Sequence, residues 1–304
     1  MTTIAEPPAE TAPSPVQNFG TAGIKLLNRP GLVTRAFMGM VAFVEQLNLK
    51  CSKVGNPPIY DNAVFPWTQE IEREWRAMRS ELDLVLTRKD DLPGFHELST
   101  DVSVISQDRG WKTFFLCGYG FRSDNNIKLC PEVWRVCQNI RGLITVMFSI
   151  LEPGKHLPPH RGPYNGVLRL HLGLIVPEPR EQLGIRVEKD VYRWKEGEAV
   201  VFDDAYEHEA WNRTPHTRVV LFVDFRKPLH FPANFLNWLL LHLAVFTPFI
   251  REGMDDQKAW EKEVLRRGRG LAEPLGRPPL RWLAFAVSSM PACSIPTTNR
   301  PRQK

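Results

Sequence analysis

The chain has 304 residues and is 43% hydrophobic, which supplies one large core, or a core with a smaller appendage, and excludes an intrinsically disordered protein. Its formal net charge of +5 is too small for an extended nucleic-acid-binding surface, so no nucleic acid is expected as a partner, although an anionic surface or small anionic ligand is favoured. The five cysteines are odd in number and lack CxxC spacing. They indicate neither a disulfide scaffold nor a thiolate metal site, and we expect a reducing compartment.

The N-terminal region divides into two segments. Residues 1–22 are expected to be a disordered leader, because residues 1–19 are rich in Pro, Ala, Thr and Glu and have no Lys or Arg of the kind that opens a secretory signal. Residues 23–53 are expected to be an amphipathic or apolar helical segment. Its apolar run from Leu32 to Val44 carries Arg35 and is short for a membrane span, so it is either a helix packed on the core or an interfacial helix.

Residues 54–230 are predicted to form one α+β domain. Its front part is helical, because apolar residues recur at helical spacing in the stretch 67–86, at Ile71, Trp75, Met78, Leu82 and Leu86. Its core, over 143–226, contains short runs of Val, Ile, Phe and Leu separated by turn residues, at 143–151, 167–176, 184–194, 198–204 and 217–225. Five such runs with no helical period between them favour a sandwich or a jelly-roll barrel.

The C-terminal region begins with a second apolar segment, predicted to be a hydrophobic helix over 231–251. Residues 234–250 carry no charge, contain Trp238, and are bordered by Arg226, Lys227 and Arg251. This pattern fits a helix inserted shallowly among anionic headgroups, or else a buried helix. Because two apolar segments bracket the middle of the chain, peripheral membrane attachment is favoured. Residues 252–304 are expected to form a charged helix and a disordered tail.

Polar side chains recur at the strand ends of the β-rich part. The stretch PPHRGPYNGVLRLHLGL (158–174) contains His160, Arg169 and His171, and the stretch VVFDDAYEHEAW (200–211) contains His208, ten residues before Arg218. Imidazoles at the mouth of a barrel suit one divalent ion such as iron or zinc. Arginines directed into an apolar barrel need a carboxylate partner, which an anionic ligand would supply.

A purely structural interpretation stands beside this one. A histidine in a strand is more often a hydrogen-bonded core residue than a metal ligand, and the arginines could form ion pairs with Asp203, Asp204 or Asp224. The joint pattern, rather than any single residue, favours a ligand-binding site.

The stretch from Ser149 to Asp224 resembles the aspartyl/asparaginyl β-hydroxylase family of iron(II)- and 2-oxoglutarate-dependent dioxygenases. The likeness is carried by FSILEPGKHLPPHRGPYNGVLRLHLGL and WKEGEAVVFDDAYEHEAWNRTPHTRVVLFVDF. It implies a double-stranded β-helix, a jelly-roll core of cupin type, that uses iron(II), 2-oxoglutarate and O₂. By position, the resemblance implies that iron is bound by His160 and His208, and that 2-oxoglutarate is bound by Ser149, Arg169, His171 and Arg218, with Arg218 facing its distal carboxylate.

One departure concerns the metal ligands. Most relatives in the wider oxygenase superfamily bind iron through two histidines and a carboxylate, whereas this chain has Gly162 in HRG, two residues after His160. The aspartyl/asparaginyl hydroxylases share this absence, so the site is expected to have two protein ligands. Asp203 or Asp204 could orient His208 or a metal-bound water, or could cap the turn instead.

Similar domains act on aspartyl or asparaginyl side chains, on free or carrier-bound amino acids, or on fatty acyl chains of bacterial lipids. The two apolar segments, together with KVGNPPIYDNAVFPWTQEIEREW and WKTFFLCGYG, resemble the bacterial lipid-hydroxylating branch. We therefore expect 2-hydroxylation of a lipid acyl chain, of ornithine lipid or lipid A type, at the cytoplasmic face of a membrane. The alternatives are hydroxylation of Asp or Asn in a peptide or protein, and a metal-binding cupin-like sensor without turnover.

Overall fold

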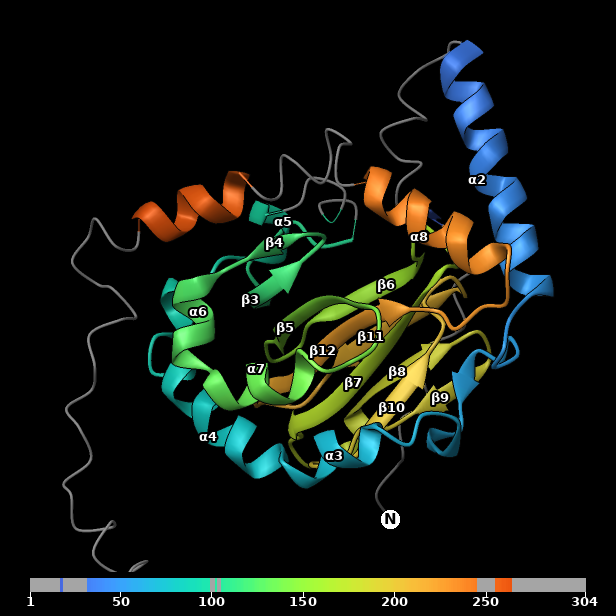
Figure 1. The fold of residues 1–304 in the computed structure, drawn as a ribbon. Helices are drawn as coiled ribbons and strands as arrows, with labels where there is room; N and C mark the ends of the chain where they lie inside the picture. The colour runs from blue at the N-terminus through green and yellow to red at the C-terminus, as the bar shows by residue number, and fades with distance from the viewer. Residues whose placement is uncertain (1–16, 19–31, 99–101, 103–104, 245–254, 264–304) are drawn as a thin grey trace, which may run out of the picture. The chain divides into compact units, whose positions relative to one another are not determined.

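The computed structural model describes residues 17–18, 32–98, 102, 105–244 and 255–263, all within the compact unit Met1–Leu271. Two facing sheets form its jelly-roll core, as the sequence predicts (Figure 1). The larger sheet has the order β2 (Ile59–Tyr60), β10 (Ala199–Phe202), β7 (Val167–Ile175), β12 (Arg218–Arg226), β5 (Leu143–Leu151), β3 (Trp111–Gly118) and β4 (Phe121–Arg122). The smaller sheet has the order β1 (Gln17–Asn18), β6 (His156–Arg161), β11 (His208–Asn212), β8 (Leu183–Val187) and β9 (Asp190–Tyr192).

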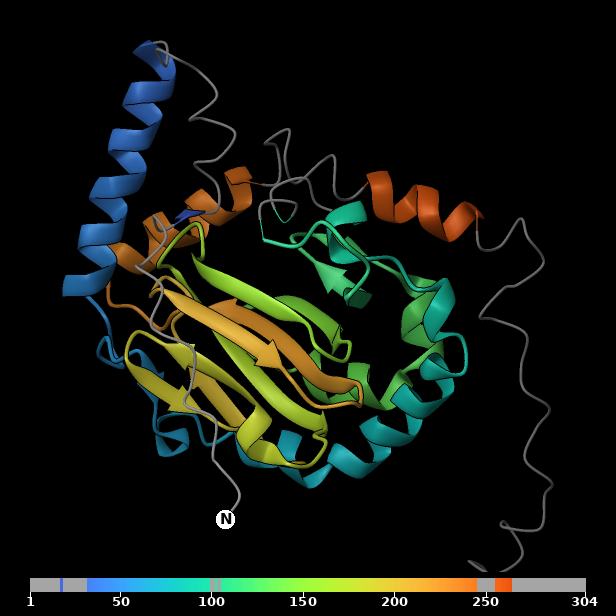
Figure 2. The same ribbon diagram turned by 180° about the vertical axis from the view of Figure 1, so that it is seen from behind.

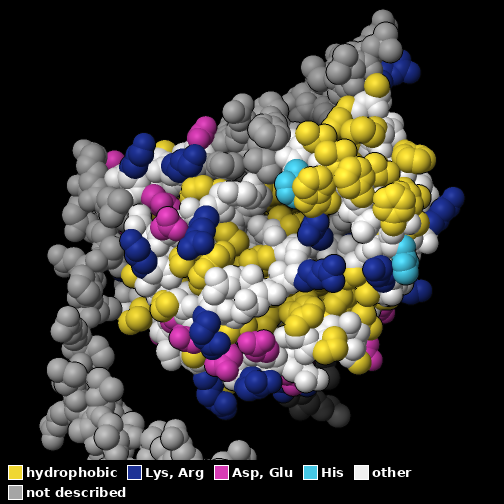
Figure 3. Space-filling view, viewed as in Figure 1, with side chains coloured by type: hydrophobic (Ala, Val, Ile, Leu, Met, Phe, Trp, Pro, Cys, Tyr) yellow, Lys and Arg dark blue, Asp and Glu magenta, His cyan; other side chains and the backbone are white. Residues whose placement is uncertain are grey.

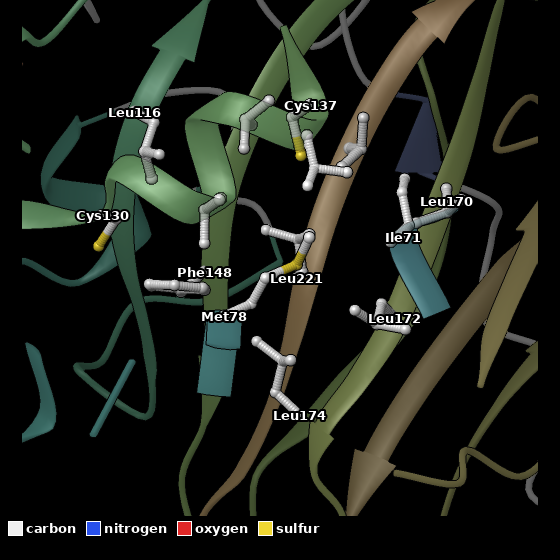
Figure 4. Packing of buried hydrophobic residues seen from close by; sticks show 14 of the residues in the cluster. Ile71, Met78, Leu116, Cys130, Cys137, Phe148, Leu170, Leu172, Leu174 and Leu221 are labelled. Carbon is white, nitrogen blue, oxygen red and sulfur yellow. The ribbon is translucent and has the colours of Figure 1, made fainter. Parts of the chain in front are cut away.

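Helices cover the outer face of the larger sheet. The predicted helix over 67–86 is instead two helices, α3 (Thr68–Arg73) and α4 (Trp75–Leu86), because the backbone of Glu74 leaves the helical region at φ −89° and ψ 4°. They pack on the sheet with α7 (Pro131–Cys137), which follows α6 (Asp124–Leu129). Figure 4 shows the contact, where Ile71 and Met78 meet leucines of the sheet.

Strand alternation sends the two sides of β7 into different environments. Leu168, Leu170 and Leu172 lie in the cluster beneath the helices and are fully buried. Arg169 and His171 point the other way, into the space between the two sheets. Strand β7 is central in the larger sheet, between β10 and β12, so polar groups on its inner side are held by strands on both flanks.

The strands differ from the five predicted runs in several places, since six strands lie outside these runs: β1, β2, β3, β4, β6 and β11. Strand β6 is unexpected because it contains Pro158 and Pro159, but these prolines fall where the register between β6 and β11 is irregular and ladder bonds are lost. The run 184–194, predicted as one strand, is a hairpin of β8 and β9, since the chain reverses at Glu188, whose φ is +55°.

The apolar segments at the two ends of the domain form helices that lie side by side, α2 (Leu32–Lys50) and α8 (Ala233–Ala244) (Figures 1 and 2). Within the described residues, no helix combines the length and hydropathy needed to span a membrane. Residues 245–251 of the predicted hydrophobic helix lie outside the described residues, as does most of 252–304, of which 255–263 form a helix.

Two residues of the expected leader, 1–22, belong to a strand. Gln17 and Asn18 form β1, which pairs in parallel with His160 and Arg161 of β6, so their backbone extends the smaller sheet. The rest of 1–22 lies outside the described residues.

A matched pair of substitutions in α4 tests the packing of the helices on the larger sheet. Leu82 is fully buried and Leu84, two residues on, is half exposed. We expect Leu82→Ala to lower the free energy of unfolding by about 2–5 kcal/mol, because it leaves a cavity, and Leu84→Ala to lower it by less than about 1 kcal/mol. Denaturant unfolding of both variants measures the difference, and equal losses would contradict this packing.

Candidate active site

Two histidines from neighbouring strands meet at one end of the barrel. The register of β6 and β11 places His160 directly opposite His208, with ring centroids 4.2 Å apart and the ring planes at 56°. Nδ1 of His160 lies 2.7 Å from the carbonyl oxygen of Pro158, and Nδ1 of His208 lies 2.9 Å from that of Tyr206. Since a carbonyl oxygen only accepts, each Nδ1 carries the proton and each Nε2 carries a lone pair, as metal binding requires.

Burial keeps both rings neutral. It lowers the pKa of His160 to about 4 and the pKa of His208 well below its ordinary value, so protons do not compete for the two nitrogens near neutral pH. In the described part of the chain, no group of three or more His, Cys, Asp and Glu side chains is placed to hold a metal. Two neutral imidazoles on neighbouring strands are donors that suit a divalent metal, and the binding of iron by these two ligands stays a prediction.

Asp204 takes the space that a side chain at position 162 would need. A Cβ added to Gly162 would lie 2.4 Å from Oδ2 of Asp204, and the amide of Gly162 donates to the backbone oxygen of Asp204 at 2.7 Å. Burial raises the pKa of Asp204 to about 7. Asp203 instead forms a fully buried ion pair with Lys227 at 2.8 Å. Of the two aspartates, only Asp204 lines the cavity beside the histidines.

Arg169 is neutralised within the protein. Its Nε lies 2.8 Å from Asp224 and its Nη2 lies 2.9 Å from Asp204, while its guanidinium stacks over Phe222 at 4.1 Å. The β7–β12 register sets Arg169 directly opposite Asp224. The ion-pair interpretation is therefore confirmed for this arginine. It also lines the cavity at the histidines, and its contact with 2-oxoglutarate stays a prediction.

Arg218 is fully buried and forms no ion pair with any residue that the structure describes. It donates one long hydrogen bond, of 3.3 Å, to the carbonyl oxygen of Ser149, and its guanidinium lies 4.4 Å from the centre of the Trp194 ring. Its Nε has no hydrogen-bond partner. Burial alone lowers its pKa to about 9. A cation in this position lacks the carboxylate that would offset its desolvation.

More unpaired polar atoms lie around Arg218. Within the described structure, neither ring nitrogen of His171 has a hydrogen-bond partner. Nε1 of Trp194 has none either. The two rings are 5.9 Å apart, and the Ser149 hydroxyl beyond them accepts from Nε1 of Trp111 at 3.0 Å. Buried polar groups are normally satisfied, so these atoms are candidates for contact with a ligand. Its donors suit a dianion with one carboxylate at Arg218, and the predicted cosubstrate residues Ser149, His171 and Arg218 are brought together here.

A cavity of about 180 Å³ opens beside the two histidines. Its wall is mainly apolar, and it includes three polar residues that the sequence did not indicate, Tyr119, Thr145 and Gln257. Thr145 Oγ1 and Gln257 Oε1 have no hydrogen-bond partner among the described residues. Gln257 comes from a segment without a motif, so no sequence signal could have found it, whereas Tyr119 lies in WKTFFLCGYG, a stretch noted only for its resemblance to the lipid-hydroxylating branch. The apolar lining residues are Phe95, Leu98, Val102, Trp111, Phe115, Phe121, Met147, Pro163 and Phe222.

The sequence around these residues is similar to that of known proteins. The family model for aspartyl/asparaginyl β-hydroxylase matches residues 72–228, which contain both histidines and all four predicted cosubstrate residues. The chain belongs to the aspartyl/asparaginyl β-hydroxylase family. It is therefore a hydroxylase of the dioxygenase type. Membership in this family does not support the alternative of a metal-binding sensor without turnover.

Two relatives in this hydroxylase family differ in how much of the chain they match. The ornithine lipid ester-linked acyl 2-hydroxylase of Rhizobium tropici is 62% identical over 257 residues, covering 84% of this chain and 92% of that protein. The aspartyl/asparaginyl β-hydroxylase of Homo sapiens is 33% identical over 168 residues, covering 53% of this chain and 21% of that protein. A solved cupin domain from an Enterobacter cloacae regulator is 12% identical over 38% of this chain and 96% of its own, with a TM-score of 0.27.

Substitution of Gly162 tests the steric relation to Asp204. We expect Gly162→Ala to displace the Asp204 carboxylate from Arg169 and to lower hydroxylase turnover by about ten-fold or more, since misplacing groups beside the reacting centre by an ångström is costly. Gly162→Asp, which adds a carboxylate, is expected to be no more active than Gly162→Ala. Steady-state turnover of both variants measures this. Activity of Gly162→Asp equal to the natural protein would show that position 162 has room for a third ligand.

Proposed function

We propose that this protein is an iron(II)- and 2-oxoglutarate-dependent hydroxylase that acts on the 2-position of a lipid acyl chain, in a lipid of the ornithine lipid type. The observation that carries the reaction class is Arg218, a fully buried cation with no carboxylate partner among the described residues, in the same barrel as two histidines that present Nε2 lone pairs. One dianionic cosubstrate and one divalent metal would complete both sets of groups.

Different residues of the site would bind the metal and the cosubstrate. His160 and His208 would hold the iron, Arg218 would pair with the distal carboxylate of 2-oxoglutarate, and the other predicted groups, Ser149, Arg169 and His171, would face its chelating end. When bound, the metal and cosubstrate supply the activation of O₂ that hydroxylation of an unactivated C–H requires. The protein binds and orients these groups, and its apolar wall excludes water from them.

Asp204 is suited to handling a proton beside the metal ligands. Its Oδ2 is held by Arg169, while its Oδ1 has no hydrogen-bond partner among the described residues. Because burial raises the pKa of Asp204 to about 7, this carboxyl holds or releases a proton near neutral pH. No other protein base is needed for the reaction.

The cavity supports an acyl chain as substrate. Its wall is dominated by aromatic and aliphatic side chains, and its charged residues are Arg169 with its two acid partners, Asp204 and Asp224. A substrate carboxylate would find no uncompensated protein cation there, which disfavours an aspartyl side chain. The Rhizobium tropici relative, named for ester-linked acyl 2-hydroxylation of ornithine lipid, supports the same substrate class.

A lipid substrate places the reaction at a membrane surface, and we propose the cytoplasmic face. The described cysteines, Cys51, Cys117, Cys130 and Cys137, are all free thiols, which supports a reducing compartment.

Substitution of Arg218 tests the cosubstrate assignment. We expect Arg218→Met to lower iron-dependent conversion of 2-oxoglutarate to succinate by about 100-fold or more, because the charge-assisted hydrogen bonds to the distal carboxylate are lost. The stabilisation that added 2-oxoglutarate gives to the natural protein in thermal unfolding should also disappear. The ligand-free variant should unfold at no lower temperature, since it no longer buries an unpaired cation.

Arg213→Met is the matched control, because Arg213 is exposed and lies five residues away. It should retain both turnover and the response to 2-oxoglutarate. Full turnover by Arg218→Met would show that the cosubstrate binds elsewhere.

Lipid analysis tests the substrate. In a deletion strain, the natural protein should restore a lipid species heavier by one oxygen on its acyl chain, and His160→Ala should not, because one of the two iron ligands is missing. Mass spectrometry of total lipids and their fragment ions locates the hydroxyl. Unchanged lipids in the deletion strain, together with active 2-oxoglutarate turnover, would instead favour a peptide substrate.

A further inference from the structure

Exposed apolar side chains are concentrated on one part of the molecule. Of the thirteen large hydrophobic residues that are exposed in the described structure, ten belong to α2, α8 or the residues just before α8. Figure 3 shows an apolar area over these two helices. We call this the α2–α8 surface, and it consists of Phe37, Met38, Met40, Phe43, Leu49, Phe231, Phe235, Trp238, Leu239 and Leu243.

The inner sides of these two helices are already satisfied. Val44 of α2 and Leu240 of α8 are buried together with Tyr164 and Val167 in a small core of their own. The helices therefore carry apolar residues on a second side, which faces outward. Residues Ala233–Ala244 include no charged side chain, although a helix that faces water normally has a polar outer side. The outward side needs an apolar environment that the described part of the protein does not provide.

The charges around this surface have one sign. In the stretches 35–56, 161–167 and 226–244, every exposed charged residue is basic: Arg35, Lys50, Lys53 and Arg161. The acid of α2, Glu45, is half-buried, and burial raises its pKa. Lys53 lies where the two helices meet the barrel, because its amide donates to the carbonyl oxygen of Pro228. An apolar centre with a basic border complements a leaflet of anionic lipid.

The same surface is joined to the cavity by one short loop, 162–167. Gly162 and Pro163 line the cavity next to His160, and the following residue, Tyr164, packs between the two helices. Asn48 of α2 donates to the Tyr164 hydroxyl at 2.9 Å, and Asn237 of α8 donates to the carbonyl oxygen of Gly166 at 2.8 Å. Both helices are thus fastened to the loop that forms the cavity wall.

We propose that the α2–α8 surface docks on an anionic bilayer leaflet and brings the cavity to the acyl chains of that leaflet. Trp238, Phe235 and their apolar neighbours enter the headgroup boundary, while the basic border contacts lipid phosphates. The delivery of acyl chains rests on the proposed function, whereas docking itself does not. The helices lie on the membrane in this arrangement, and the loop 162–167 sets the distance between leaflet and metal ligands.

Co-sedimentation of the full chain with vesicles tests the docking. Vesicles of phosphatidylcholine, with or without phosphatidylglycerol, contain no substrate headgroup, so binding is measured apart from catalysis. We expect the double variant Phe235→Ser/Trp238→Ser to lose about ten-fold or more of its affinity for the anionic vesicles. The matched control is Leu84→Ser/Val191→Ser, which removes two residues of similar exposure elsewhere and should bind as the natural protein does.

A second pair tests the basic border. Lys50→Gln/Lys53→Gln should remove most of the preference for phosphatidylglycerol, and the effect should shrink with added salt, whereas Lys128→Gln/Lys189→Gln should change neither. Each variant should keep the natural rate of 2-oxoglutarate conversion with detergent-dispersed lipid, which shows that it is folded.

Three results would overturn the proposal: undiminished vesicle binding by Phe235→Ser/Trp238→Ser, an equal loss in its control, or self-association without lipid that this double variant abolishes. The last result, measured by light scattering, would identify the surface as a contact between two copies of the chain. Vesicle binding that follows the expected pattern while no lipid is hydroxylated would leave docking supported and the proposed substrate wrong.

Discussion

The cost of burying positive charge is the constraint on which this barrel depends. Its larger sheet carries two arginines on the inner side, and the protein treats them differently. Arg169 is compensated by Asp204 and Asp224, whereas among the described residues Arg218 has a long hydrogen bond and an aromatic ring but no carboxylate. An uncompensated buried cation costs several kcal/mol, and the proposed binding of an anion would offset that cost.

A similar logic holds beside the two histidines. A side chain at position 162 would meet the Asp204 carboxylate, which Arg169 holds in place. One ion-pair network therefore limits the space at position 162 and fixes the position of a carboxyl whose pKa burial raises to about 7. The network joins β7, β12 and the turn after β10, so it forms only once the larger sheet has paired in register.

This dependence on register explains what the sequence could and could not reveal. Strands β5, β7 and β12 are long and apolar, and their bounds agree with the predicted runs to within a residue. Strand β6 was missed because its prolines read as a turn, although it holds His160. The sequence could not distinguish a paired Arg169 from an unpaired Arg218, because Asp224 is 55 residues from Arg169 in the chain and opposite it only across the sheet. Gln257 reaches the cavity from a helix that carries no motif.

The barrel contains the residues proposed for the chemistry, whereas the helices beside it form the surface proposed for membrane docking. The family model covers 72–228 and ends before α8, and the human relative matches only 53% of the chain. The Rhizobium tropici relative matches 84% of the chain. Any continuous stretch of this chain that is as long as this match includes α8. The residues predicted to hold metal and cosubstrate belong to strands of the barrel and not to the flanking helices. Access to a chain buried in a leaflet would depend instead on the surface next to the cavity, and here a pair of apolar helices is hydrogen-bonded to the loop that follows the cavity wall. Substrate class in such an enzyme is therefore set as much by the surface next to the cavity as by the cavity itself.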